Sequence, residues 1–135
     1  DHLGGGDRTI DGRTMTYAMY MDPPLGRVGI NEKEALADDS RRIMMATRAM
    51  SEISRAIEKD ETAGLVKMFV DADTEEVLGA TILGVGGDEI ISMFTAYMYT
   101  GASYKLFSQL MFNHPTVSEL MPYIMRDLKP LNYEG

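Results

Sequence analysis

The amino-acid sequence predicts an α+β fold, in which an antiparallel sheet of about four or five strands has helices packed on one side. Two observations predict it. Residues 14–83 contain alternating or β-branched segments typical of strands, and after Gly84 the apolar residues recur at helical spacing. Strands that come first and helices that come last are typical of this fold class. The βαβαβ order of a nucleotide-binding domain is not visible.

The domain is expected to occupy residues 14–135. Residues 1–13 are rich in glycine and aspartate without periodicity, which is typical of a linker or a domain edge. Residues 14–22 alternate as a strand does, with Met15, Tyr17, Met19 and Met21 on one face. Pro23 and Pro24 end this strand, because proline has no N–H to donate to a neighbouring strand.

Two helices are expected in the first half of the chain. Asn31 and Glu34 have the spacing of a capping pair, so residues 32–38 are predicted as a short surface helix. Residues 51–60 are predicted as a second helix from apolar residues at helical spacing, namely Ile53, Ala56 and Ile57.

The remaining strands are expected at residues 41–47, 65–70 and 77–83. The last two are rich in β-branched and aliphatic residues and flank a polar turn, which predicts an antiparallel hairpin. Asp71, Asp73 and Glu75 resemble the start of a calcium loop. Glu76 and Ile82 stand where that loop needs a glycine and a bidentate glutamate, so a solvated hairpin turn is predicted instead.

A helix is predicted over residues 88–100, with apolar residues on most of its circumference, so it should be buried on two sides. One stripe is Ile90, Met93, Phe94 and Tyr97, and the second is Ile91, Thr95 and Met98. Gly101 ends this helix. Residues 84–87 read Gly-Val-Gly-Gly, which lacks the third glycine of a dinucleotide fingerprint and is predicted as a turn.

Two helices are expected near the C-terminus. Ser103 can cap a helix that runs to Phe112, and Thr116 can cap one that runs to about Asp127. The inner face of the first is predicted to carry Leu106, Phe107 and Leu110.

Composition excludes several classes of function. Lys and Arg number 13 against 21 Asp and Glu, a net charge of −8, so neither nucleic acid nor an anionic membrane is an expected partner. No segment approaches the roughly 20 apolar residues of a membrane span. Residues 1–6 also lack the pattern of a signal peptide, so a cytoplasmic protein is expected. The absence of cysteine excludes disulfides and thiolate chemistry within the chain and is compatible with a reducing compartment.

One motif near the C-terminus can carry chemistry. It reads His114-Pro115-Thr116-Val117-Ser118-Glu119. Histidine has an ordinary pKa near 6.5 and can exchange a proton at neutral pH, although a histidine in a loop before a helix can also be without function. Glu119 has two readings. It can orient the imidazole of His114, or it can complete a capping box with Thr116.

The motif resembles the C-terminal signature of the pyridine nucleotide-disulfide oxidoreductases, which include glutathione reductase, lipoamide dehydrogenase and mercuric reductase. Residues 22–29 (DPPLGRVG) are similar to the start of that family's interface domain. Residues 79–84 (GATILG), followed by Asp88-Glu89, are similar to its passage from strand to helix. The resemblance extends over residues 16–131.

This resemblance implies a C-terminal dimerisation domain of a flavoenzyme. It implies that His114 is the acid-base residue for redox thiols, that Glu119 orients it, and that the pair serves the partner subunit of a homodimer. This chain has neither a cysteine pair nor a G-x-G-x-x-G motif. The resemblance implies that these lie in FAD- and NAD(P)-binding domains before Asp1. The chain alone is expected to bind neither FAD nor NAD(P)H. The alternative is a stand-alone module of the same fold that self-associates without catalysis.

The dimer interface is expected on the C-terminal helices. A sheet can cover only one face of the helix at residues 88–100, which leaves the other for a neighbouring helix or a second subunit. The expected contact residues are Met93, Tyr97, Phe107, Leu110, Met111 and His114. The twelve methionines can fill an irregular core or line this interface.

Overall fold

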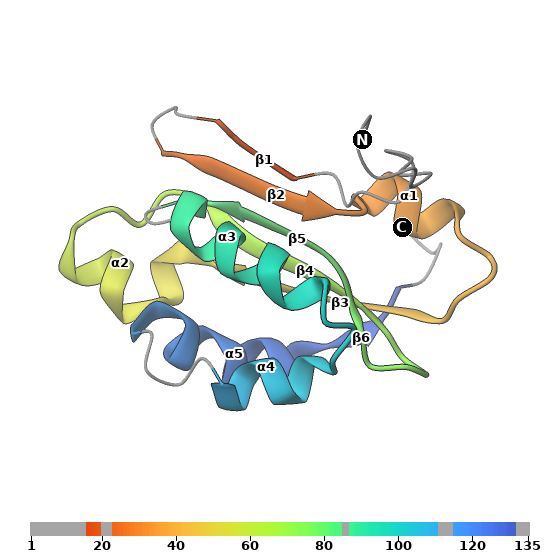
Figure 1. Cartoon of the computed structure of the whole chain (residues 1–135). Coiled ribbons are helices and arrows are strands. Elements are labelled where there is room, and N and C mark those ends of the chain that lie inside the picture. Colours follow the sequence, from red (N-terminus) through yellow and green to blue (C-terminus); the bar gives the residue numbers. More distant parts are fainter. Residues whose placement is uncertain (1–15, 20–22, 85–86, 111–114, 132–135) are drawn as a thin grey trace, which may run out of the picture.

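The computed structural model describes residues 16–19, 23–84, 87–110 and 115–131. Its centre is one antiparallel sheet of six strands in the order β1-β2-β5-β4-β3-β6 (Figure 1). The strands are β1 (Thr16–Met19), β2 (Leu25–Gly29), β3 (Ile43–Ala49), β4 (Leu65–Asp71), β5 (Val77–Leu83) and β6 (Lys129–Pro130). The predicted α+β class is confirmed, and the sheet has β2 and β6 in addition to the four strands predicted.

The helices lie between and after these strands. They are α1 (Glu32–Ala37), the 3-10 turn η2 (Met50–Glu52), α2 (Ser54–Glu58), α3 (Gly87–Met98), α4 (Tyr104–Leu110) and α5 (Pro115–Asp127). The predicted helix at residues 51–60 is therefore two short pieces. No helix in the described ranges combines the length and the apolar character that crossing a membrane requires.

Helices α3 and α5 pack on the same face of the sheet. A side chain at Gly26 of β2 would meet α3, and Arg48 of β3 contacts α5. The strand register places Gly26, Ile82, Val66 and Arg48 in one row across four strands, so they share a face. The core on this face includes Val28, Ala46, Val66, Met68, Ala80, Ile82, Ile90, Ile91, Phe94, Met121 and Ile124.

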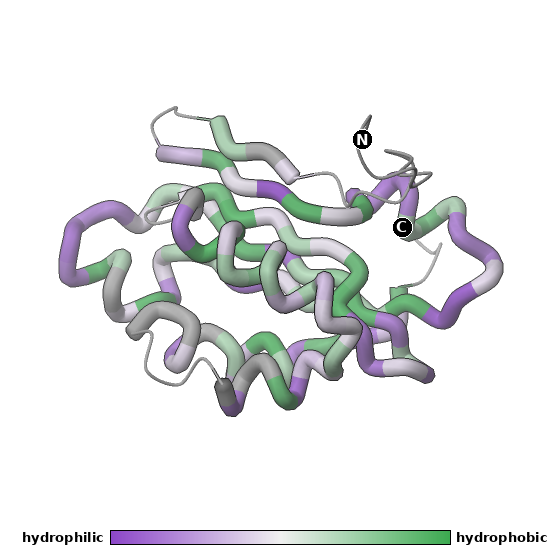
Figure 2. The backbone as a smooth tube through the Cα atoms, in the orientation of Figure 1, coloured by the Kyte–Doolittle hydropathy of each residue, from purple (hydrophilic) through white to green (hydrophobic). Residues whose placement is uncertain are grey.

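The opposite face of the sheet is covered at one end by α1. Ala35 of this helix packs with Ile43 of β3 and Phe69 of β4, all of them buried. The predicted capping pair is confirmed, since the Asn31 side chain accepts the N–H of Glu34 at 2.8 Å. Figure 2 shows hydrophilic residues gathered in the connections that follow α1 and α2.

The hairpin of β4 and β5 agrees with its prediction. Between the strands, Asp71 accepts the backbone N–H groups of Asp73 at 2.8 Å and of Thr74 at 3.1 Å. Asp73 pairs instead with Arg42 at 2.7 Å. The carboxylates of this turn therefore have separate partners; Asp73 is exposed, as expected for a solvated turn, whereas Asp71 is buried at 7% exposure.

Leu106 differs from its prediction. It is 42% exposed, although it was expected on the inner face of α4. Tyr104, which is 8% exposed, faces the core instead. Two residues rotate a helix by about 200°, so a buried Tyr104 places Leu106 on the outer face.

Candidate functional site

Helix α5 contains Glu119 and begins directly after His114. It starts at Pro115, so Thr116 lies inside the helix and is not its cap. Proline suits the first helical position because the N–H it lacks would have no partner within the helix. Met121 and Ile124 are 0% and 1% exposed and hold α5 against the sheet.

The Glu119 carboxylate is joined to a distant part of the chain. Its Oε1 accepts the backbone N–H of Ser54, the first residue of α2, at 2.7 Å. The reading of Glu119 as part of a capping box with Thr116 is wrong, because Thr116 lies inside α5 and is not its cap. His114 lies outside the described residues, so its pairing with Glu119 stays a prediction.

Arg48 ties the C-terminal half of α5 to β3. Its guanidinium carbon lies 4.0 Å from the centre of the Tyr123 ring, and Nη1 lies 3.3 Å from Oδ2 of Asp127. Nε is 3.4 Å from Oε2 of Glu52, an ion pair whose geometry is not that of an aligned hydrogen bond. The Arg48 side chain is 15% exposed. Helix α5 is therefore held in its first half by the N–H of Ser54 and near its end by Arg48 of β3.

The residues expected at the dimer interface differ in how far they are buried and in whether the structure describes them. Tyr97 is 6% exposed, and its hydroxyl donates to the carbonyl of Ser103 at 2.7 Å. It packs in the core of one subunit, and its place in or beside the dimer contact stays a prediction. Met93 is partly buried against the core. Phe107 and Leu110 lie in α4, and Met111, like His114, lies outside the described residues.

Comparison with a family model identifies the family of this chain. The model described as "Pyridine nucleotide-disulphide oxidoreductase, dimerisation domain" matches residues 15–124. The chain belongs to this family. Its fold and the resemblance found in its sequence agree with this assignment.

Individual relatives support the same conclusion. The probable pyridine nucleotide-disulfide oxidoreductase RclA of Escherichia coli is 36% identical over 118 residues, which are 87% of this chain and 26% of that protein. The mitochondrial dihydrolipoyl dehydrogenase of Canis lupus familiaris is 31% identical over 117 residues, or 87% and 23% of the two chains. The chain spans about a quarter of the length of these relatives.

A solved structure confirms the fold of the dimerisation domain. The HOCl-induced flavoprotein disulfide reductase RclA from Escherichia coli superimposes with a TM-score of 0.80 at 33% identity. The match covers 92% of this chain and 28% of the solved one.

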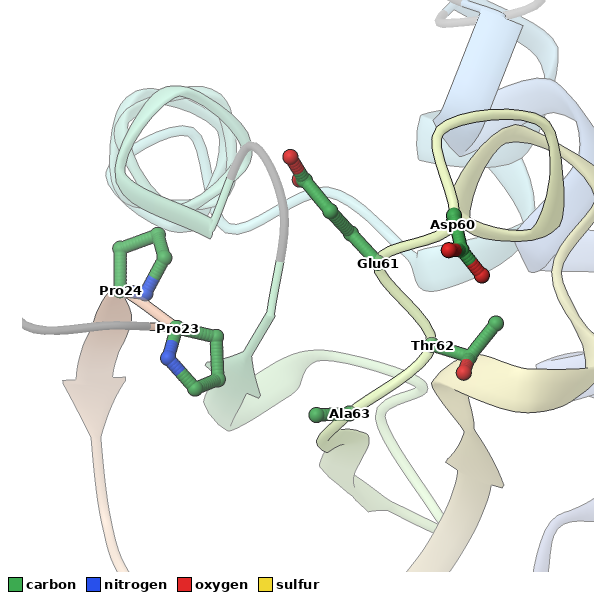
Figure 3. Close-up of a pocket in the computed structure, with 6 residues that line it drawn as sticks. All are labelled: Pro23, Pro24, Asp60, Glu61, Thr62 and Ala63. Carbon is green, nitrogen blue, oxygen red and sulfur yellow. The ribbon is translucent and has the colours of Figure 1, made fainter.

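One hollow in the described part of the dimerisation domain has about 560 Å³ and lies between Pro23-Pro24 and residues 60–63 (Figure 3). Asp60 and Glu61 line it and point away from one another in the figure. Their charges would repel the phosphates of FAD, and the lining residues include no cation to offset them.

Sequence patterns did not identify two of the groups that hold α5. Ser54 acts through its backbone N–H, which leaves no mark in the side-chain pattern. Arg48 did leave a signal, because a cation in an otherwise apolar strand segment is a candidate for a buried ion pair.

Proposed function

We propose that this chain is the C-terminal dimerisation domain of a flavin-dependent pyridine nucleotide-disulfide oxidoreductase. In the whole enzyme, electrons pass from NAD(P)H through FAD to a disulfide or another acceptor. The chain contributes homodimer contacts and the His114–Glu119 pair, which acts at the redox site of the partner subunit. The family match over residues 15–124, in a chain about a quarter as long as its relatives, supports this proposal.

The chemistry proposed for His114 is proton transfer. Reduction of a disulfide breaks the S–S bond with two electrons, and each sulfur takes up a proton to become a thiol. An imidazolium supplies such a proton, and the resulting imidazole takes one from a thiol in the reverse direction. A carboxylate beside the ring favours the charged form and fixes its orientation, which is the role proposed for Glu119.

The position of Glu119 supports this pairing. Pro115, which is bonded to His114, and Glu119 are four residues apart in α5, so they lie on one face of the helix about one turn apart. A carboxylate has two acceptor oxygens. Oε1 accepts the N–H of Ser54, so Oε2 is the oxygen proposed to accept the imidazole N–H.

The homodimer contact is proposed on α3 and α4, at Met93 and the segment from Phe107 to His114. An exposed leucine on α4, Leu106 at 42%, and Tyr99 after α3, at 63%, add apolar surface there. A stable contact buries about 1,200 Å² or more in total. Sedimentation at several concentrations tests it, and a monomer throughout would contradict the proposal.

The decisive experiment replaces His114 by Gln in the full-length enzyme. Stopped-flow absorbance follows flavin reduction by the pyridine nucleotide and then reoxidation by the acceptor. We expect the second half-reaction to slow by about 10² to 10⁴, the usual contribution of general acid-base catalysis, while the first is nearly unchanged. Equal losses in both half-reactions would contradict the assigned role.

The matched variant is Glu119→Gln, which keeps the shape of the side chain and removes its charge. The orienting role predicts slower reoxidation at an unchanged melting temperature. The isolated 135-residue chain serves as a second control and is expected to be colourless and inactive. Stoichiometric FAD binding by the isolated chain would contradict the placement of the flavin site in other domains.

A further inference from the structure

The bond between Glu119 and Ser54 joins residues that are 65 positions apart in the sequence. At 2.7 Å between the carboxylate oxygen and the backbone nitrogen, it has the length of a charge-assisted hydrogen bond. Glu119 is only partly buried, so water alone could solvate its charge. The carboxylate is held at one oxygen instead.

The N–H of Ser54 is available because of its place in α2. The first hydrogen bond of this helix runs from the N–H of Ile57 to the carbonyl of Ile53, at 3.1 Å. Ser54 is therefore the first helical residue, and its N–H has no acceptor within the helix. Glu119 supplies that acceptor.

The donor is also fixed in space. Ile53 and Ala56, on either side of Ser54, are 2% and 0% exposed and belong to the core. The N–H of Ile53 donates to the carbonyl of Met50 at 3.0 Å, and the N–H of Met50 donates to Gly64 at 3.0 Å. A donor held by the core and by these bonds can position a flexible glutamate more precisely than water can.

We infer that the Ser54 N–H is a positioning group for the acid-base pair: it holds one oxygen of Glu119 so that the other stays available to His114. This inference rests on the proposed function. Ser54 is not a catalytic residue, since it acts only through Glu119. A purely structural role, in which Glu119 merely satisfies the start of α2, predicts a change in stability with unchanged kinetics.

Ser54→Pro deletes this donor with little other change. Proline is favoured at the first position of a helix. Ile53 has φ −107° and ψ 121°, the extended conformation that a residue before proline prefers. The proline ring carbon that replaces the hydrogen displaces the carboxylate. Ser54→Ala is the matched control, because it keeps the N–H and removes only an exposed hydroxyl.

The measurement is reoxidation of the reduced full-length enzyme by its acceptor, as a function of pH. We expect Ser54→Pro to slow this step about tenfold, the effect of losing one hydrogen bond to a charged group, while Ser54→Ala changes nothing. In the pH–rate profile, the pH at which the imidazolium of His114 loses its proton should move to a lower value. A normal rate and profile in a folded Ser54→Pro enzyme, or equal losses in both variants, would overturn the inference.

A double-mutant cycle shows whether the effect passes through Glu119. In a Glu119→Ala background, Ser54→Pro should cause no further loss, because the carboxylate it positions is gone. Additive losses would overturn the inference. Should Ser54→Pro fail to fold, Glu119→Asp takes its place. Its carboxylate is one methylene too short to reach Ser54, and the same tenfold loss and profile shift are expected, whereas wild-type kinetics would overturn the inference.

These outcomes are distinguishable from failure of the proposed function. If His114→Gln slows reoxidation and Ser54→Pro does not, the acid-base proposal stands and the positioning role is wrong. If His114→Gln leaves reoxidation unchanged, the proposed function itself is wrong.

Discussion

Two arginines contact the same tyrosine ring in α5, and the structure predicts that only one of them stabilises the fold strongly. The guanidinium carbon of Arg48 lies 4.0 Å from the centre of the Tyr123 ring and that of Arg126 lies 5.1 Å away. The Arg48 side chain is 15% exposed, whereas that of Arg126 is 66% exposed. Replacing each by Met removes the charge and keeps most of the apolar stem.

The expected magnitudes follow from these exposures. A largely desolvated cation over an aromatic ring contributes about 1–2 kcal/mol. The ion pairs of Arg48 with Asp127 and Glu52 add a few tenths of a kcal/mol each, because both carboxylates remain partly in water. We therefore expect Arg48→Met to lower the free energy of unfolding by about 1.5–2.5 kcal/mol. Arg126→Met should cost less than about 0.5 kcal/mol, since exposed charges are screened.

Thermal and urea unfolding followed by circular dichroism measure both variants. A domain of this size loses roughly 3–4 °C per kcal/mol, so the melting temperature should fall by about 5–10 °C for Arg48→Met and by less than about 2 °C for Arg126→Met. Equal losses in the two variants would refute the argument from burial. An unchanged melting temperature for Arg48→Met would show that Arg48 does not stabilise the packing of α5 on the sheet.

Two further predictions concern other parts of the fold. Gly26→Ala should lower the free energy of unfolding, measured in urea, by about 1–3 kcal/mol. The new Cβ would lie 2.6 Å from the carbonyl oxygen of Gly87 and 2.9 Å from Cβ of Ile91, so α3 must shift. Unchanged stability would contradict this close packing. The Ser40 hydroxyl and backbone N–H, which hydrogen-bond the Asp38 carboxylate, lower the pKa of Asp38 below the ordinary aspartate value. Its stabilising contribution should therefore be present above that ordinary pKa and be lost as pH falls through the folded-state pKa. In a ¹³C NMR titration, Ser40→Ala should raise the midpoint of Asp38, and an identical midpoint would exclude this cause.

Local signals in the sequence predicted the elements whose causes are local. The helix after Asn31 was predicted from a cap that the structure contains, and the hairpin from two aliphatic runs around a polar turn. Strand β2 was missed because Leu25–Gly29 contains two glycines, which are poor strand formers, and it is stabilised by pairing with β1 and β5. Strand β6 has two residues and one is Pro130, so it has no pattern to detect.

The sequence predicted the residues of the candidate site but not the contacts that position them. The spacing of His114 and Glu119 identified the residues through a family resemblance. No pattern indicated that Glu119 reaches Ser54, because the contact joins distant segments through a backbone group. Tyr97 was expected in or beside the dimer contact, on one apolar stripe of its helix. The turn after α3 supplies an internal acceptor for its hydroxyl, and that acceptor allows it to be buried.

The short last strand of the sheet has a consequence for how molecules of this protein meet. Lys129 and Pro130 are both exposed, and β6 is the outermost strand on its side of the sheet. A strand of another molecule that approached this edge would meet a positive charge and a proline that has no N–H to offer. Such an edge resists the edge-to-edge pairing of strands that leads to aggregation. The two residues of β6 therefore protect this part of the sheet against pairing with a strand of another molecule.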